Sequence, residues 1–200
     1  MSCTKYLGLE IDELLKWDQQ SVVLTKKIRR TFYKFLRLRN LLDRPTLRSV
    51  YCAIVQSLLM YGIMLWGGAY DKYIHSIGVA QRSVIKIILK KNRRYPTESC
   101  FAELNVLSVP RLYVRALLFQ AFNDPIVVSG VLSVPRLHIP LVRTTMVQRS
   151  YAYLVPRVFN RLPGELRCLR LKSSYRKKTK DWLKTLTPEE VNDLIQPNHQ

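Results

Sequence analysis

The residues from Ser49 to Tyr70 constrain the fold of this chain most strongly, because none of them carries a charge. The chain as a whole is strongly basic, with 33 Lys and Arg against 14 Asp and Glu and a net charge of +19. A charge-free run of this length is sufficient to cross a lipid bilayer. It must therefore be buried, either in a membrane or in the core of a folded domain.

The pattern within this run favours a core helix. Large apolar residues recur at helical spacing along one side, namely Leu47, Val50, Tyr51, Ile54, Val55, Leu58 and Leu59. A second side is smaller and more polar, with Ser49, Cys52, Ala53, Gln56 and Ser57. Such two-faced helices are typical of soluble cores. We predict a central core helix that closes at Gly67-Gly68, with membrane insertion as the alternative.

Helical periodicity also dominates on both sides of this run. Residues 4–12 predict a short strand, followed by a turn over residues 13–18. One helix is predicted over residues 20–42, with an apolar stripe formed by Leu24, Ile28, Thr31, Phe35, Leu38 and Leu42. Asp43-Arg44-Pro45-Thr46 predicts a break, with Thr46 as the N-cap of the next helix. Further helices are predicted at residues 73–90, 98–104 and 110–122.

The sequence changes character after residue 123, where prolines become frequent and periodicity weakens. We expect extended segments and short helices there. Val106–Leu112 recurs identically as Val131–Leu137, which indicates a local duplication, because a solenoid needs more than two repeats. Two helices are predicted near the C-terminus, at residues 172–184 and, after the capping box Thr187-Pro188-Glu189-Glu190, up to Ile195.

The predicted fold class is therefore mainly α, in three parts. A short strand and turn occupy residues 1–19, a helical bundle residues 20–123, and an irregular, proline-punctuated region with short helices residues 124–200. With 48% hydrophobic residues the chain has enough apolar material for a core.

Lys and Arg gather in three clusters, and the positive charge predicts a polyanionic partner, nucleic acid first and an anionic membrane second. The clusters are Lys26, Lys27, Arg29, Arg30, Lys34 and Arg37; Lys90, Lys91, Arg93 and Arg94; and Arg176, Lys177, Lys178 and Lys180. The first cluster projects from the helix side opposite the apolar stripe, and Asp43 is the only acidic residue between Lys26 and Arg48. We predict that it binds phosphates, the alternative being a solvated helix face. Either of the other two equally fits a nuclear-localisation patch.

Aromatic residues lie within or beside these clusters, which suits stacking on unpaired bases. They are Tyr33, Tyr95, Tyr175 and Trp182. Core packing is the preferred interpretation of Trp182, whereas Tyr95 is retained as a candidate binding residue beside the second cluster.

Sequence motifs for catalysis or metal binding are missing. The sequence has no adjacent pair of aspartates of the kind that holds two divalent ions in polymerases, and no glycine-rich phosphate loop. Cys3, Cys52, Cys100 and Cys168 are widely spaced and form no Cys/His cluster. We therefore assign no catalytic residue, no metal ligand and no cofactor, and expect reduced thiols in an intracellular protein.

Several short motifs occur in a fixed order along residues 4–183. They are Lys5-Tyr6-Leu7-Gly8 with Ile11-Asp12, Leu15-x-Trp17, the lysine-rich segment, Tyr61-Gly62-x-x-x-Trp66, Gln81 with Ile85, Arg94-Tyr95-Pro96-Thr97, and Asn160-x-Leu162-Pro163. In this order and spacing they resemble the region that follows the catalytic palm in reverse transcriptases of non-LTR (LINE-type, jockey-like) retrotransposons. Two positions depart from the family pattern: Gln20 stands where histidine is usual, and Phe159 where tryptophan is common.

The resemblance implies a helical thumb that clamps the RNA or RNA–DNA template–primer through its backbone. Residues 20–123 would be the thumb, the first basic cluster its gripping surface, and the missing palm its partner. The catalytic hairpin would lie N-terminal to Met1, so the complete RNA-directed DNA polymerase would use Mg²⁺ while this chain alone would be inactive. The chain then looks like the terminal fragment of an element or of a gene.

Two other interpretations remain open. In the first, the chain is a stand-alone basic helical module that binds nucleic acid or protein. In the second, it is a membrane-associated basic protein that inserts residues 49–70. Salt-sensitive binding to a hybrid duplex in the absence of lipid would count against the last of these.

Overall fold

The computed structural model describes residues 3–124 and 135–196 and is mainly helical, which confirms the predicted fold class. Its residues form two compact units, the first ending at Val109 and the second beginning at Pro110. The boundary between the two units therefore lies at residues 109 and 110, whereas the sequence predicted a boundary after residue 123.

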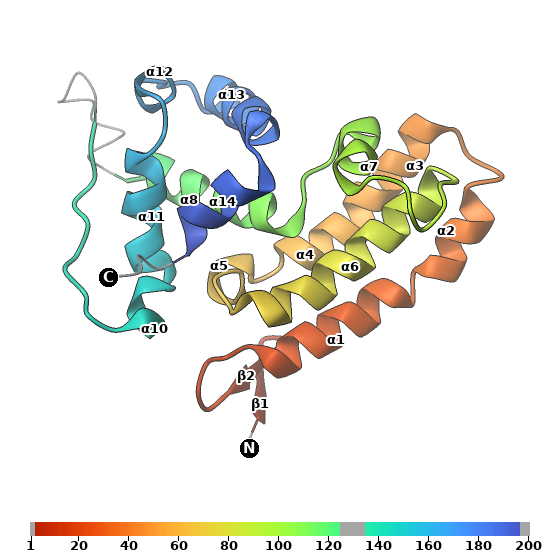
Figure 1. The fold of residues 1–200 in the computed structure, drawn as a ribbon, viewed down its shortest axis with the longest axis horizontal. Coiled ribbons are helices and arrows are strands. Elements are labelled where there is room, and N and C mark those ends of the chain that lie inside the picture. The colour runs from red at the N-terminus through yellow and green to blue at the C-terminus, as the bar shows by residue number, and fades with distance from the viewer. Residues whose placement is uncertain (1–2, 125–134, 197–200) are drawn as a thin grey trace. The chain divides into compact units, whose positions relative to one another are not determined.

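The first unit consists of a small hairpin followed by helices (Figure 1). Its elements are β1 (Cys3–Tyr6), β2 (Leu9–Asp12), α1 (Asp18–Arg29), α2 (Phe32–Leu38), α3 (Arg44–Tyr51), η1 (Cys52–Gln56), α4 (Ser57–Met60), α5 (Ile63–Trp66), α6 (Asp71–Ile88) and α7 (Thr97–Leu104). Helix α6 is the central element, because α1, α2 and α7 all pack against it.

The N-terminal segment is a hairpin, where the sequence predicted a single strand over residues 4–12. Tyr6 pairs with Leu9 across a two-residue turn in which Leu7 and Gly8 both have positive φ, 46° and 81°. Two-residue hairpin turns favour this conformation because it matches the twist of the strands. After β2, the buried carboxylate of Asp12 accepts hydrogen bonds from the backbone N–H groups of Lys16 and Trp17, at 2.8 and 2.6 Å. The predicted turn is thus held by one aspartate.

The helix predicted over residues 20–42 is two helices. Helix α1 ends at Arg29, and α2 runs only from Phe32 to Leu38. At the break, the Thr31 hydroxyl donates to the carbonyl oxygen of Ile28 at 2.7 Å. Threonine side chains that bond to nearby carbonyls compete with the regular helix ladder, which explains the interruption. Within the predicted stripe, Leu24, Ile28, Thr31 and Phe35 are buried, while Leu38 and Leu42 are half-buried.

The N-cap of α3 is Asp43, so the prediction of Thr46 was wrong. The Asp43 carboxylate accepts from the backbone N–H of Thr46 at 3.3 Å, and Pro45 lies in the first helical turn. Proline fits there because the first-turn N–H groups have no partner within the helix. The cap therefore lies before the proline rather than after it.

The charge-free run forms the predicted two-faced helix but stops earlier than expected. Residues Leu47, Tyr51, Val55 and Leu59 are buried, whereas Ser49, Ala53 and Ser57 are exposed. Helices α3, η1 and α4 follow one another to Met60, with a π-helical turn at Cys52–Gln56. None of the helices in the described ranges combines the length and apolar character that a bilayer crossing requires.

Gly62 explains why this helix does not continue to Gly67-Gly68. Its φ is +63°, and a Cβ at this position would lie 2.8 Å from the Cδ1 atom of Leu9. Only glycine tolerates both the left-handed conformation and this close approach. The chain therefore turns at Gly62 into the separate short helix α5, and the indole N–H of Trp66 donates to the carbonyl oxygen of Tyr61 at 2.9 Å.

The second unit contains α8 (Val109–Phe122), α10 (Thr145–Gln148), α11 (Tyr151–Asn160), α12 (Gly164–Arg167), α13 (Lys172–Thr185) and α14 (Pro188–Ile195). The predicted capping box opens α14, with both of its hydrogen bonds present. Residues 135–144 have no helix or strand. This region thus has the predicted mixture of irregular segments and short helices, although α11 continues through Pro156. The second copy of the heptapeptide lies largely outside the described residues.

Aromatic packing joins α8 to α13 within this unit. The Tyr175 ring lies 4.6 Å from that of Phe122, between ring centres, and its hydroxyl donates to the carbonyl oxygen of Leu118. Thr179 and Leu183 continue the buried side of α13 at helical spacing. One side of α13 is therefore fixed in the core, and its Lys and Arg residues project from the rest of the helix.

The buried side chain of Gln81 holds together three separate parts of the first unit. Its amide nitrogen donates to the Tyr51 hydroxyl at 2.8 Å and to the carbonyl oxygen of Leu107 at 2.9 Å. Its amide oxygen accepts from the backbone N–H of Val109 at 3.1 Å. Because buried polar groups are costly without partners, this residue links α6, α3 and the segment before α8.

We expect Gln81→Leu to destabilise the first unit by about 2–4 kcal/mol, because it leaves the buried groups of Leu107 and Val109 without partners. Native-state hydrogen exchange of the α6 amides measures the effect on this unit. The control is His75→Ala at an exposed position of α6, which should change the opening free energy by less than about 0.5 kcal/mol. Equal exchange in the two variants would contradict this role for Gln81.

Candidate nucleic-acid interface

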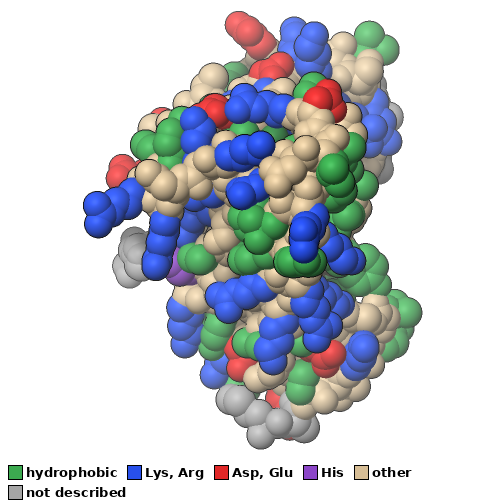
Figure 2. Space-filling model, turned by 90° about the vertical axis from the view of Figure 1, so that its right-hand side faces the viewer, with side chains coloured by type: hydrophobic (Ala, Val, Ile, Leu, Met, Phe, Trp, Pro, Cys, Tyr) green, Lys and Arg blue, Asp and Glu red, His purple; other side chains and the backbone are tan. Residues whose placement is uncertain are grey.

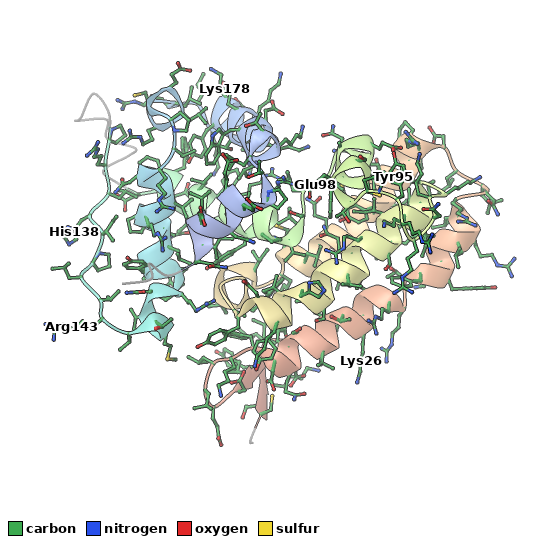
Figure 3. The ribbon with its side chains drawn as sticks, in the orientation of Figure 1. Lys26, Tyr95, Glu98, His138, Arg143 and Lys178 are labelled. Carbon is green, nitrogen blue, oxygen red and sulfur yellow. The ribbon has the colours of Figure 1, made fainter. Side chains whose placement is uncertain are left out.

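Helix α1 and the residue that follows it present four of the predicted cations to solvent. Leu24 and Ile28 are buried against the rest of the unit, whereas Lys26, Lys27, Arg29 and Arg30 are all exposed. In Figure 3 the labelled Lys26 points away from α6. The packing of α1 thus directs this part of the cluster into solvent, as the helical spacing predicted.

Helix α2 continues this surface with Lys34 and Arg37, which are both exposed. The Arg37 guanidinium is held beside Tyr33, because its Nε and Nη2 atoms donate to the Tyr33 hydroxyl at 2.8 and 2.6 Å. We call Lys26, Lys27, Arg29, Arg30, Lys34 and Arg37 the α1–α2 basic surface. The break at Thr31 leaves its members on two short helices instead of one long one.

Among the described residues, no carboxylate forms an ion pair with the α1–α2 basic surface. Figure 2 views the molecule from the side on which α2, α3 and α7 lie in Figure 1, and blue side chains outnumber red ones on this face. A surface of this kind has a high positive potential and attracts anions.

The second cluster is divided by the structure. Lys90, Arg93 and Arg94 are exposed, but Lys91 and Tyr95 are half-buried and belong to a network around Glu103. The Tyr95 hydroxyl donates to the Glu103 carboxylate, and the Lys91 ammonium lies 3.5 Å from the same group and 4.3 Å from the centre of the Tyr95 ring. Arg44 contacts the other Glu103 oxygen at 3.5 Å.

This network changes the acidity of both groups that it joins. The hydrogen bond from Tyr95, with Lys91 and Arg44 nearby, lowers the pKa of the Glu103 carboxyl below its usual range. The same bond to Glu103 is the main reason why the pKa of Tyr95 is raised. Lys91 and Tyr95 therefore have a structural role that joins the end of α6 to α7. The sequence pattern did not predict this role, because Glu103 lies outside the basic cluster, on the next helix.

The third cluster lies on α13, with Arg176, Lys177 and Lys178 exposed and Lys180 half-buried. Lys178 points outward in Figure 3. Because Tyr175, Thr179 and Leu183 fix the opposite side of this helix, these residues form part of a folded surface instead of an extended peptide.

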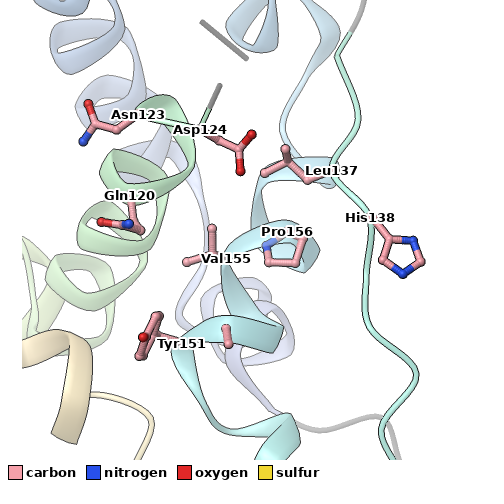
Figure 4. A pocket seen from close by; sticks show the side chains of 9 residues that line it. Gln120, Asn123, Asp124, Leu137, His138, Tyr151, Val155 and Pro156 are labelled. Carbon is pink, nitrogen blue, oxygen red and sulfur yellow. The ribbon is translucent and has the colours of Figure 1, made fainter. Parts of the chain in front are cut away.

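The second unit has a pocket of about 410 Å³ between α8, α11 and the segment at Leu137 and His138 (Figure 4). His138 and Asp124 do not point toward one another there. Among the described residues no group of three or more His, Cys, Asp or Glu side chains could hold a metal ion. The described residues that line the pocket thus form no converging set of catalytic or metal-binding groups.

The chain was compared with protein families, curated proteins and solved structures. No protein-family model, no curated protein and no solved structure matches this chain.

The Glu103 network predicts a pH-dependent contribution to stability. Because folding lowers the pKa of Glu103, its contribution is present above the ordinary value for glutamate, about 4.3, and is lost as the pH falls through the lowered value. We expect wild type to melt at a higher temperature than Glu103→Gln at pH 6, and the difference in melting temperature to shrink as the pH falls below the ordinary glutamate pKa. Thermal melting followed by circular dichroism measures this, and a difference that does not change with pH would contradict it.

Proposed function

We propose that the first unit binds the sugar–phosphate backbone of RNA, DNA or an RNA–DNA hybrid through the α1–α2 basic surface. The observation that supports this is the set of six exposed cations without carboxylate partners among the described residues. Self-repulsion makes such a set unfavourable in the free protein, and phosphates relieve it. Each phosphate that a cation neutralises releases a counterion, which adds affinity without sequence preference.

We propose further that this binding belongs to the thumb region of a non-LTR retrotransposon reverse transcriptase. The ordered motifs from Lys5 to Pro163 support this assignment by resemblance. In this role the chain holds the template–primer, and the chemistry belongs to a palm whose paired carboxylates are not among these residues. The chain's own contribution is position and electrostatic attraction. It includes no catalytic step.

The structure refines which of the predicted residues support the proposal. The exposed cations Lys90, Arg93 and Arg94 remain candidates for backbone contact. Lys91 and Tyr95 are less suited to it, because binding would have to compete with their contacts to Glu103. We therefore expect the main contribution to come from the α1–α2 basic surface.

Charge reversal tests the proposal. We expect Lys26→Glu, Arg30→Glu and Lys34→Glu together to weaken binding to a labelled RNA–DNA hybrid by at least about tenfold at low salt. The slope of log affinity against log salt should become shallower by roughly 2 to 3, about one for each lost phosphate contact. Fluorescence anisotropy over a salt series measures both quantities.

The matched control places the same charge change on α13, with Lys172→Glu, Lys177→Glu and Lys178→Glu. All three are exposed, and glutamate is a good helix former. This variant has the same net charge as the test variant, so a purely non-specific effect would be equal in both. Equal losses of affinity in the two variants, or none in the first, would refute the proposed interface.

A further inference from the structure

Four aromatic residues lie within or beside the basic clusters, and the structure leaves one of them open to solvent. Tyr175 is 0% exposed and packs against Phe122, and Trp182 is half-buried. Tyr95 is half-buried and donates its hydroxyl to Glu103. Tyr33, by contrast, is 63% exposed. The residue best placed to meet a ligand is therefore Tyr33 and not Tyr95.

Tyr33 occupies the outermost position of α2. Phe35 is fully buried, and residues 33 and 37 lie one turn apart on the opposite side of the helix. A large aromatic side chain in such a position gains little from the protein core. Neighbouring Arg30 and Lys34 are exposed and have no ion-pair partner among the described residues.

Arg37 orients the Tyr33 ring. Its guanidinium donates two hydrogen bonds to the hydroxyl and lies 5.1 Å from the ring centre. These contacts restrict the tyrosine before any ligand arrives, so less conformational entropy is lost on binding. They also fix a positive charge over the ring, so a base would stack on the ring face that Arg37 does not cover, with this charge close by.

We propose that Tyr33, held by Arg37, is a stacking platform for an unpaired base of a single-stranded nucleic acid whose backbone follows the α1–α2 basic surface. The inference rests on the proposed function for the presence of nucleic acid and adds that the ligand has an unpaired segment at α2. A tyrosine ring accepts any base on its face, so this contact favours single strands without reading sequence.

Two ligands of equal length and charge separate stacking from backbone attraction. One is a short oligothymidylate, and the other is an abasic oligomer with the same phosphates and no bases. Wild-type full chain should bind the oligothymidylate at least about fivefold more tightly, the lower end of the effect of one stacked base. Fluorescence anisotropy with labelled oligomers measures the two affinities.

Three variants test whether the Tyr33 ring causes the preference for oligothymidylate over the abasic oligomer. Tyr33→Leu should lose the preference for the base-bearing oligomer, while its affinity for the abasic oligomer stays within about twofold of wild type. Tyr33→Phe should keep part of the preference, because it keeps the ring but loses the two hydrogen bonds from Arg37. Tyr6→Leu, at a position 62% exposed on β1, is the matched control and should behave as wild type.

The outcomes distinguish this inference from the function on which it rests. Equal affinity of wild type for both oligomers, or an unchanged preference in Tyr33→Leu, overturns the stacking platform. If that binding is salt-sensitive and is weakened by charge reversal at Lys26, Arg30 and Lys34, the backbone interface stands without stacking. If neither oligomer nor hybrid duplex binds at low salt, both proposals fail.

Discussion

The packing of α1 against α6 decides which side chains of the first unit can meet a ligand. Buried Leu24 and Ile28 fix the inner side of α1, and the Ser21 hydroxyl donates to the carbonyl oxygen of Tyr73 at the start of α6. Once this side is fixed, Lys26 must face solvent, since it lies on the opposite side of the same helix, and Arg30, the residue directly after α1, is also exposed. The interface thus follows from the core, and α6 in turn depends on the buried hydrogen bonds of Gln81.

Lys and Arg side chains have different structural roles in different parts of the chain. Two buried arginines bind backbone carbonyl oxygens. Arg157 donates to Asp193 and Gln196 near the C-terminal end of α14, and Arg111 to Leu186. Cations at helix C-terminal ends also interact favourably with the helix dipole. By contrast with Arg157 and Arg111, the six cations of the α1–α2 basic surface bind no backbone carbonyl oxygen and no carboxylate among the described residues.

The sequence predicted the helical class, the buried side of the core helix and the outward face of α1, because these follow from periodicity. It did not predict the break at Thr31, which depends on the hydrogen bond from the Thr31 hydroxyl to the carbonyl oxygen of Ile28. It also did not predict the turn at Gly62, where the Leu9 side chain leaves no room for a Cβ atom. Tyr95 was a candidate because its neighbours along the chain are basic. Its actual partner, Glu103, lies on the next helix, and the exposure of Tyr33 likewise became clear only from the packing.

Lysine footprinting on the full chain tests the central claim most directly. The protein is acetylated briefly with and without an RNA–DNA hybrid, and the modification of each lysine is measured by mass spectrometry. The account predicts that bound nucleic acid protects Lys26, Lys27 and Lys34, while the exposed Lys172, Lys177 and Lys178 of α13 react at nearly the same rate as in the free protein. Protection confined to α13, or equal at all six lysines, would contradict a nucleic-acid interface on α1 and α2.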